Sequence, residues 1–220
     1  MKIKICGITR VNETEYLNEA GVDYAGFVFY EKSKRNVTVQ KAKELINLLN
    51  PEIKKVAVMV SPTADMIENI KEAGFDYYQI HKSLTTEVLD TVDKPVWYAV
   101  NIDNEEELNK KEQFINELPD TLVKKIDAIV VDAPVFGSGQ TFNWRKSKRL
   151  KKAGSQSPPA SMLDRFTFVL AGGLNANNVA EGIEIFNPDV VDISSGVEGA
   201  DGKDKGLIDE FVKAVRNTEV

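Results

Sequence analysis

Short apolar segments alternate with longer amphipathic segments along the whole chain of 220 residues. A short apolar run predicts a strand, whereas apolar residues spaced by three and four positions predict a helix. The predicted strands cover residues 3–6, 24–29, 55–60, 77–81, 96–101, 128–132, 167–171 and 190–194. Strands that are each followed by a helix run parallel, and eight of them can close so that no strand edge stays unpaired. We therefore predict an α/β fold in which residues 1–220 form a single (β/α)8 TIM barrel domain.

The helices between these strands follow from the same spacing. The clearest ones cover residues 39–49, 64–73, 105–118, 176–186 and 207–215. Thr38, Thr63 and Asn175 are expected to cap helices, because their side-chain oxygens can accept from free backbone N–H groups. Gly21 and Gly74 are expected to end helices, because glycine readily adopts the left-handed conformation found there.

The sixth strand-helix unit is the weakest of the eight. Its predicted helix, near residues 144–153, is short and basic, and it runs into a loop at residues 154–159. No segment reads as a linker that would divide the chain into two domains.

Composition narrows the classes of function. The net charge of −6 argues against a nucleic-acid binder, because phosphate backbones select for excess Lys and Arg. No apolar run approaches the roughly 20 residues that span a bilayer, and no secretory pattern precedes the first strand. One cysteine cannot form an intrachain disulfide, so we expect a cytoplasmic protein. An anionic small molecule is a suitable partner if backbone amides supply the positive potential.

Two residues at strand ends point to chemistry, because (β/α)8 enzymes place their active sites where strands end. Cys6, the only cysteine, ends the first strand, and Asp132 ends the sixth. A free cysteine is often just a small buried hydrophobe, and a strand-end aspartate often caps a turn. Together, however, the two offer one group that can take a proton and one that can give a proton.

Glycine-bearing loops follow the seventh and eighth strands, at Gly172-Gly173 and Ser195-Gly196. Barrels often bind phosphate in these loops through exposed backbone amides. Tight-turn geometry also explains the glycines. Both explanations can hold, since the lack of a Cβ permits the turn and the close approach of an oxyanion.

The sequence predicts neither a metal site nor a cofactor site. One histidine and one cysteine exclude a zinc cluster of the usual spacing. Residues 137–141 lack the third glycine of a dinucleotide fingerprint, and no Gly-Lys-Ser/Thr phosphate loop occurs.

One set of segments carries a recognisable pattern: residues 4–9 (KICGIT), 26–30 (GFVFY), 32–35 (KSKR), 79–81 (QIH), Asp132, 137–139 (GSG), 141–142 (TF), 170–175 (LAGGLN) and 192–198 (DISSGVE). Taken together, these segments resemble the phosphoribosylanthranilate isomerases of tryptophan biosynthesis. They occur in collinear order over nearly the whole chain, and the order of all of them is more specific than any one motif.

The resemblance implies an Amadori rearrangement of N-(5-phosphoribosyl)anthranilate to 1-(2-carboxyphenylamino)-1-deoxyribulose 5-phosphate, without cofactor or metal. By motif, Asp132 would be the general acid that protonates the ring oxygen. Cys6 would be the general base that removes the C2′ proton. Positive surroundings would then need to lower the pKa of this thiol only modestly from about 8.5.

The remaining site residues are assigned by the same resemblance. Arg35 would lie near the anthranilate carboxylate, unless it belongs only to a solvated run of basic residues. Gly7, Gly173, Ser195 and Gly196 would also line the substrate site. The last three would hold the phosphate against their backbone amides.

Four positions qualify this assignment. Lys82 stands where the family usually has glycine, and could alter affinity or substrate scope. Glu31 replaces a common proline, which would leave the second loop less rigid. Asn143 replaces a usual aspartate, with a mild expected effect because asparagine can also cap a helix. His81, the only histidine, is interpreted as structural rather than as an acid or base.

Two other functions stay open. One is a related phosphosugar barrel enzyme such as the histidine-pathway isomerase, which uses carboxylates in place of this cysteine. The other is a non-catalytic phosphate-binding barrel, against which the pair Cys6 and Asp132 argues. The expected oligomeric state is monomer or homodimer.

Overall fold

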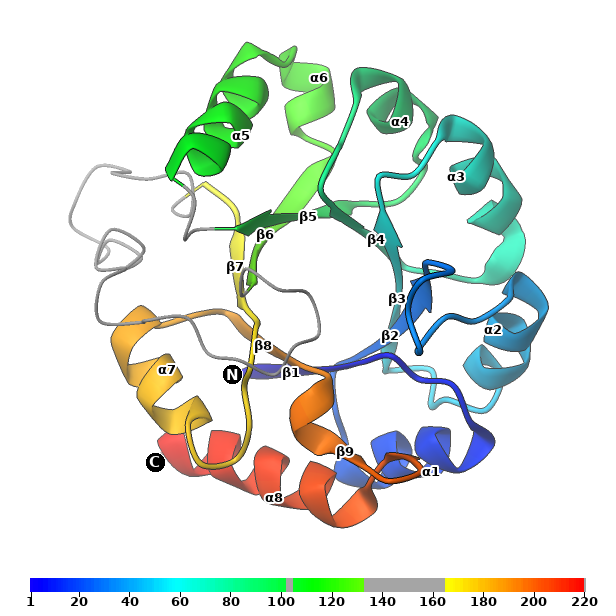
Figure 1. Cartoon of the computed structure of the whole chain (residues 1–220), viewed down its shortest axis with the longest axis vertical. Coiled ribbons are helices and arrows are strands. Elements are labelled where there is room, and N and C mark those ends of the chain that lie inside the picture. The colour runs from blue at the N-terminus through cyan, green and yellow to red at the C-terminus, as the bar shows by residue number, and fades with distance from the viewer. Residues whose placement is uncertain (102–104, 133–164, 220) are drawn as a thin grey trace.

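The computed structural model describes residues 1–101, 105–132 and 165–219. Eight parallel strands form a closed barrel in chain order, with β8 beside β1 (Figure 1). They are β1 (Lys2–Cys6), β2 (Tyr24–Phe29), β3 (Lys54–Val60), β4 (Tyr77–His81), β5 (Val96–Asn101), β6 (Ile126–Asp132), β7 (Thr167–Leu170) and β8 (Val190–Ile193). The predicted fold class is confirmed. The largest difference in bounds is at β6, which begins at Ile126 rather than at residue 128.

Helices surround the barrel (Figure 1). They are α1 (Val11–Ala20), α2 (Val39–Ile46), α3 (Ala64–Ile70), α4 (Thr86–Thr91), α5 (Glu105–Glu117), α6 (Asp120–Val123), α7 (Val179–Phe186) and α8 (Lys205–Arg216). Single 3-10 turns form η1 (Lys71–Ala73), η5 (Ser195–Val197) and η6 (Asn217–Glu219). A small antiparallel hairpin, β9 (Glu198–Gly199) and β10 (Gly202–Lys203), follows η5.

Four of the five predicted helix caps and stops are confirmed, although α2 ends at Ile46 rather than at residue 49. The hydroxyl oxygens of Thr38 and Thr63 accept from the N–H groups of Lys41 and Met66 at 3.1 and 3.3 Å. Such N-terminal caps satisfy donors that the helix itself leaves free. Gly21 ends α1 and Gly74 ends η1, with φ of 61° and 89°.

Helix α7 begins three residues later than predicted, and Asn175 is not its cap. The Asn175 side-chain oxygen accepts from the N–H of Asn177 at 2.9 Å, and the Asn175 N–H donates to Asn178 Oδ1 at 2.8 Å. These bonds build a turn before the helix, so the helix starts only at Val179. The predicted sixth helix, at residues 144–153, lies outside the described residues.

The interior of the barrel changes from aromatic to polar side chains along its axis. At the amino end, the rings of Tyr24 and Tyr77 pack against fully buried Trp97, with centroids 4.9 and 5.3 Å away. Toward the carboxyl end, buried polar side chains replace the aromatic rings, among them Lys4 and Gln79. One end of the barrel is therefore closed by apolar packing, and the other presents polar groups.

Within the part of the chain that the structure describes, every helix is too short or too polar to cross a membrane.

Candidate active site

Cys6 ends β1 and is buried between two neighbouring strands. In the parallel register it lies opposite Gly26 of β2, where a Cβ would come within 2.8 Å of the Cys6 sulfur. On the other side, the Ser194 hydroxyl donates to the Cys6 carbonyl at 2.9 Å. The thiol thus depends on a glycine in the next strand, since any side chain there would displace it.

The electrostatic surroundings of Cys6 correct one expectation. Burial raises the pKa of this thiol, and Asp192 raises it further, while Lys4 and Lys203 lower it. The net effect is an increase, whereas the sequence predicted a modest decrease. The reason is desolvation, because the hydration that a buried thiolate loses outweighs the stabilisation that the charges of Lys4 and Lys203 provide.

Lys4 and Asp192 form a buried ion pair inside the barrel, with 2.7 Å between Lys4 Nζ and Asp192 Oδ2. The two residues are opposite each other in the register of β1 and β8. Burial opposes the charge on Lys4, but Asp192 and Cys6 raise its pKa, so the amine stays protonated. Lys4 is a site residue that was not predicted from the sequence. A lysine and an aspartate within otherwise apolar strands were the available signal, because such residues are rarely buried unless paired.

His81 has the structural character expected of it. Its Nε2 lies 2.9 Å from Gln79 Nε2, which donates to it. Burial, followed by the charges of Lys4 and Lys111, lowers the pKa of His81 to about 3. The imidazole is therefore neutral at physiological pH, which suits a buried hydrogen-bonding group rather than a cationic acid.

Arg35 lies directly over Gly7, the residue after Cys6. Gly7 has φ of 86°, and a side chain on it would overlap the Cδ of Arg35. The backbone of the first loop thus makes room for the side chain of the second. The structure therefore brings Arg35 close to Cys6, and Gly7 allows it to do so.

The guanidinium of Arg35 is already paired with a carboxylate of the protein. Its Nε donates to Glu198 Oε1 at 2.5 Å and its Nη2 to Glu198 Oε2 at 2.9 Å. Lys203 and Lys34 each approach Glu198 at 2.8 Å. Burial disfavours the charge on Glu198, but hydrogen bonds from Arg35 and the charge of Lys203 hold its pKa well below its usual range. Glu198 belongs to the matching segment 192–198, but no function for it was predicted from the sequence.

The loops after β7 and β8 are in contact through Gly196 and Leu174. Gly172 and Gly173 have φ of 86° and 66°, which lie in the left-handed region that favours glycine. A Cβ on Gly196 would overlap the carbonyl oxygen of Leu174. Ser195 and Gly196 open the single turn η5, and the first residues of such a turn have N–H groups without a partner inside it.

Asp132 is the last residue of β6, and its backbone pairs with Asn101 of β5. It therefore ends its strand at the carboxyl end of the barrel, as Cys6 does. The predicted segments at residues 137–139 and 141–142, and Asn143, lie outside the described residues.

Lys82 adopts a conformation that explains why glycine is usual there. Its φ is 61°, and its carbonyl accepts from the Tyr98 hydroxyl at 3.2 Å. A residue with a Cβ is strained in this left-handed region. Glu31 is exposed in the loop after β2, and nothing in the structure explains a glutamate at this position.

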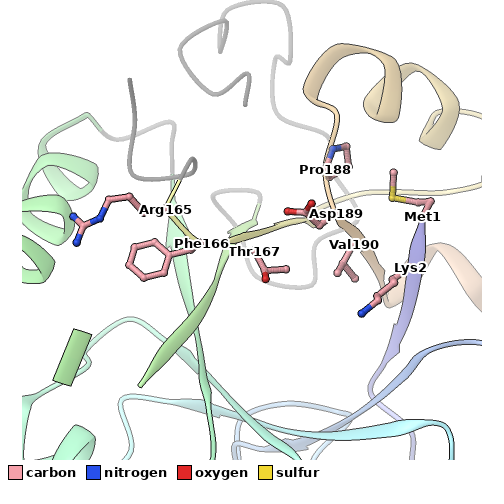
Figure 2. Close-up of a pocket in the computed structure, with 8 residues that line it drawn as sticks. All are labelled: Met1, Lys2, Arg165, Phe166, Thr167, Pro188, Asp189 and Val190. Carbon is pink, nitrogen blue, oxygen red and sulfur yellow. The ribbon is translucent and has the colours of Figure 1, made fainter. Parts of the chain in front are cut away.

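A surface pocket lies at the opposite end of the barrel from Cys6. Figure 2 shows its lining, which includes Lys2, Thr167 and Asp189 from the amino ends of β1, β7 and β8. Within the described ranges, no three His, Cys, Asp or Glu side chains gather where they could hold a metal ion.

Comparison with known proteins identifies the family. The family model of N-(5'-phosphoribosyl)anthranilate (PRA) isomerase matches residues 3–214. An N-(5'-phosphoribosyl)anthranilate isomerase of Thermoanaerobacter pseudethanolicus is 38% identical over 220 residues, which is 98% of each chain.

Two solved structures extend the comparison. Monomers generated from the dimeric phosphoribosylanthranilate isomerase of Thermotoga maritima are 30% identical, with a TM-score of 0.76 and 99% of each chain covered. A phosphoribosylanthranilate isomerase in complex with reduced 1-(o-carboxyphenylamino)-1-deoxyribulose 5-phosphate is 28% identical, with the same TM-score and coverage. The family match over nearly all of the chain shows that this protein belongs to the phosphoribosylanthranilate isomerase family.

Proposed function

We propose that the protein catalyses the Amadori rearrangement of N-(5-phosphoribosyl)anthranilate to 1-(2-carboxyphenylamino)-1-deoxyribulose 5-phosphate in tryptophan biosynthesis. The observation that carries this proposal is the placement of Arg35 over Gly7, beside Cys6. A carboxylate-binding group and a base are thereby held at one mouth of the barrel. Family membership supports the same reaction.

The rearrangement needs two proton transfers. Asp132 would give a proton to the furanose ring oxygen, so that the C1′–O bond breaks and a protonated Schiff base forms. The Cys6 thiolate would then take the C2′ proton, leaving an enolamine that tautomerises to the ketone. Burial raises the pKa of Cys6, which makes its thiolate a stronger base but less populated at neutral pH.

Arg35 would bind the anthranilate carboxylate. Glu198 takes one N–H from Nε and one from Nη2. An arginine has five such donors, so the end of the fork still has donors to offer to a second carboxylate.

The phosphate would lie against the backbone amides of Gly173, Ser195 and Gly196. The contact between Gly196 and Leu174 supports this proposal, because it joins the two loops from which the amides come. Left-handed glycines in the first of these loops turn the backbone without side chains in the way of an oxyanion.

Steady-state turnover tests the function and separates it from the two alternatives. We expect turnover of N-(5-phosphoribosyl)anthranilate and none of the histidine-pathway aminoaldose. A barrel that only binds phosphate would retain affinity for both compounds and convert neither. Turnover of the histidine-pathway compound alone would overturn the proposal.

The oligomeric state is proposed as a monomer or a homodimer, and the Thermotoga maritima relative is described as dimeric. Analytical ultracentrifugation decides between the two, and a tetramer would contradict both.

We also expect a cytoplasmic location, because a free catalytic thiol needs a reducing environment.

A further inference from the structure

The contact between Arg35 and Glu198 leaves one edge of the guanidinium bonded and the other available. The bonded edge consists of Nε and Nη2, each donating to a different oxygen of Glu198. The other edge consists of Nη1 and the second hydrogen of Nη2. A carboxylate can bind either edge of an arginine with two parallel hydrogen bonds.

We propose that Glu198 is a positioning residue, which holds Arg35 by one edge so that the other edge meets the carboxylate of the anthranilate ring. This inference rests on the proposed function, since it assumes that Arg35 binds that carboxylate. It assigns a role to a side chain that would not itself touch the substrate.

Glu198 is itself held too firmly to leave its place. Its carboxylate accepts from Lys203 Nζ at 2.8 Å, and the Lys203 side chain is only 1% exposed. Removing the carboxylate would leave this buried ammonium uncompensated, which is costly. The contact with Lys34 adds less, because Lys34 is 72% exposed and its charge is screened by solvent.

The backbone also fixes Glu198 relative to the first loop. Glu198 pairs with Lys203 in the β9–β10 hairpin, and the Lys203 N–H donates to Glu13 Oε1 at 2.9 Å. The other oxygen of Glu13 accepts from the N–H groups of Thr9 and Arg10 at 2.6 and 3.0 Å. Buried Glu13 thus ties the loop after Cys6 to the hairpin that carries Glu198.

Glu198 supports the end of the Arg35 side chain. The aliphatic part of Arg35 lies against Gly7, and among the described residues only Glu198 hydrogen-bonds to its guanidinium. A long arginine side chain has considerable rotamer freedom, and ordering it on binding would weaken affinity. A fixed carboxylate removes that freedom before the substrate arrives.

Glu198 could instead compete with the substrate for Arg35. In that case the substrate carboxylate would displace Glu198, and removing its charge would tighten binding. The buried partner Lys203 argues against displacement. The two roles predict opposite changes in affinity, so one variant separates them.

The decisive variant is E198Q, studied with two stable ligands by calorimetry. One ligand is reduced 1-(o-carboxyphenylamino)-1-deoxyribulose 5-phosphate, and the other is the same compound without its carboxylate. The glutamine keeps the shape of Glu198, but its NH2 faces one of the two arginine donors and cannot accept from it. We expect E198Q to bind the carboxylate ligand about tenfold more weakly, as for loss of one charge-assisted contact.

The ligand without the carboxylate and the kinetic constants distinguish a positioning role from a general structural defect. Binding of the ligand without the carboxylate should not change in E198Q, whereas a merely structural defect would weaken both. With the natural substrate, KM should rise by a similar factor while kcat stays within about twofold. In an R35A background, E198Q should add almost nothing, because both changes remove the same interaction.

Two control variants are expected to leave ligand binding unchanged. E19Q makes the same change in an ion pair with Lys205 on the exposed outer surface, and should behave as the parent. K34Q removes only the exposed partner of Glu198 and should also behave as the parent. Thermal unfolding checks that each variant is folded. If E198Q does not fold, E198Q/K203M removes both buried charges together and takes its place.

The outcomes distinguish this inference from the proposed function. Unchanged or tighter binding of the carboxylate ligand by E198Q would overturn the positioning role. If the parent turns over no N-(5-phosphoribosyl)anthranilate, or if R35A binds both ligands as the parent does, the proposed function fails first. If the parent and E198Q prefer the carboxylate ligand to the same extent, the positioning role of Glu198 is wrong while the proposed function stands.

Discussion

Cys6 lies in surroundings that favour the protonated form of its thiol. Burial raises the pKa of the thiol, and the nearby charges of Lys4 and Lys203 only partly oppose that effect. We expect the ultraviolet absorbance of the thiolate to titrate with a midpoint above about pH 8.5, the ordinary value for cysteine. Because Cys6 is the only cysteine, C6A supplies the baseline. A midpoint below the ordinary value would contradict the structure of the site.

His81 should make stability depend on pH. Burial lowers its pKa from 6.5 to about 3 in the folded protein, so between these values only the unfolded chain takes up the proton. Folding is therefore favoured above about pH 6.5 and weakens as the pH falls, by at most roughly 1.4 kcal/mol per pH unit from this group. Urea unfolding of the parent and of H81Q at several pH values measures the difference. Parallel curves for the two proteins would count against a buried neutral imidazole.

Lys82 stores strain that glycine would release. Its φ of 61° lies in the left-handed region, where a Cβ costs about 1 kcal/mol. We expect K82G to raise the free energy of unfolding by about 0.5–1 kcal/mol, because glycine loses part of the gain through its flexible unfolded state. K82A is the matched control and should give no such gain. Equal stability of K82G and K82A in urea would rule out the backbone explanation.

Sequence patterns identify single residues better than they identify pairs. The position of Cys6 at a strand end is visible in the sequence, because a strand-to-glycine junction is a local pattern. The partner of Lys4, by contrast, is 188 residues away along the chain, and the two meet only through the register of β1 and β8. Burial by distant strands raises the pKa of Cys6, and the charges of Lys4, Asp192 and Lys203 modify it, so the direction of this shift could not be predicted from neighbours in the sequence.

At the scale of elements, the loops after β7 and β8 act as one packed unit. A side chain on Gly196 would overlap the backbone of Leu174, so even alanine must push the two loops apart. We expect G196A to lower the free energy of unfolding by about 1–3 kcal/mol and to weaken binding of inorganic phosphate, because overpacking shifts the backbone. Urea unfolding and calorimetry measure the two effects.

Gly199 offers a control in the same region. A Cβ there would meet Asp204 at an ordinary distance of 3.5 Å, so G199A should change neither stability nor phosphate binding much. If G196A and G199A behave alike, close contact between the two loops does not explain Gly196.

Helices and strands differ in how well the sequence predicts them here. Each of the eight barrel strands contains a short apolar run, and all eight predicted strands are present. Helix α7 shows why boundaries are harder: Asn175 has the chemistry of a cap but uses it for a preceding turn. Hydrogen-bonding residues such as asparagine stabilise turns and caps equally well, so spacing alone does not choose between them.

On the scale of the whole molecule, closing the barrel assembles the site. Strands β1, β2 and β8 bring Cys6, Gly26 and Ser194 together, although their loops are far apart in the sequence. The hairpin after β8 then reaches back to the loops after β1 and β2 through Glu13 and Glu198. Sequence periodicity predicts the closed barrel, but these contacts between loops depend on side-chain geometry that periodicity does not contain.

The most direct test of the central claim is steady-state turnover of N-(5-phosphoribosyl)anthranilate by the parent, C6A and D132N. We expect the parent to form the ketose product and each variant to lose at least about a hundredfold in kcat, as for loss of a general acid or base. Both variants should keep the parent's circular dichroism and its affinity for the reduced product. Near-parent kcat in C6A, or a parent that forms no product, would contradict the account.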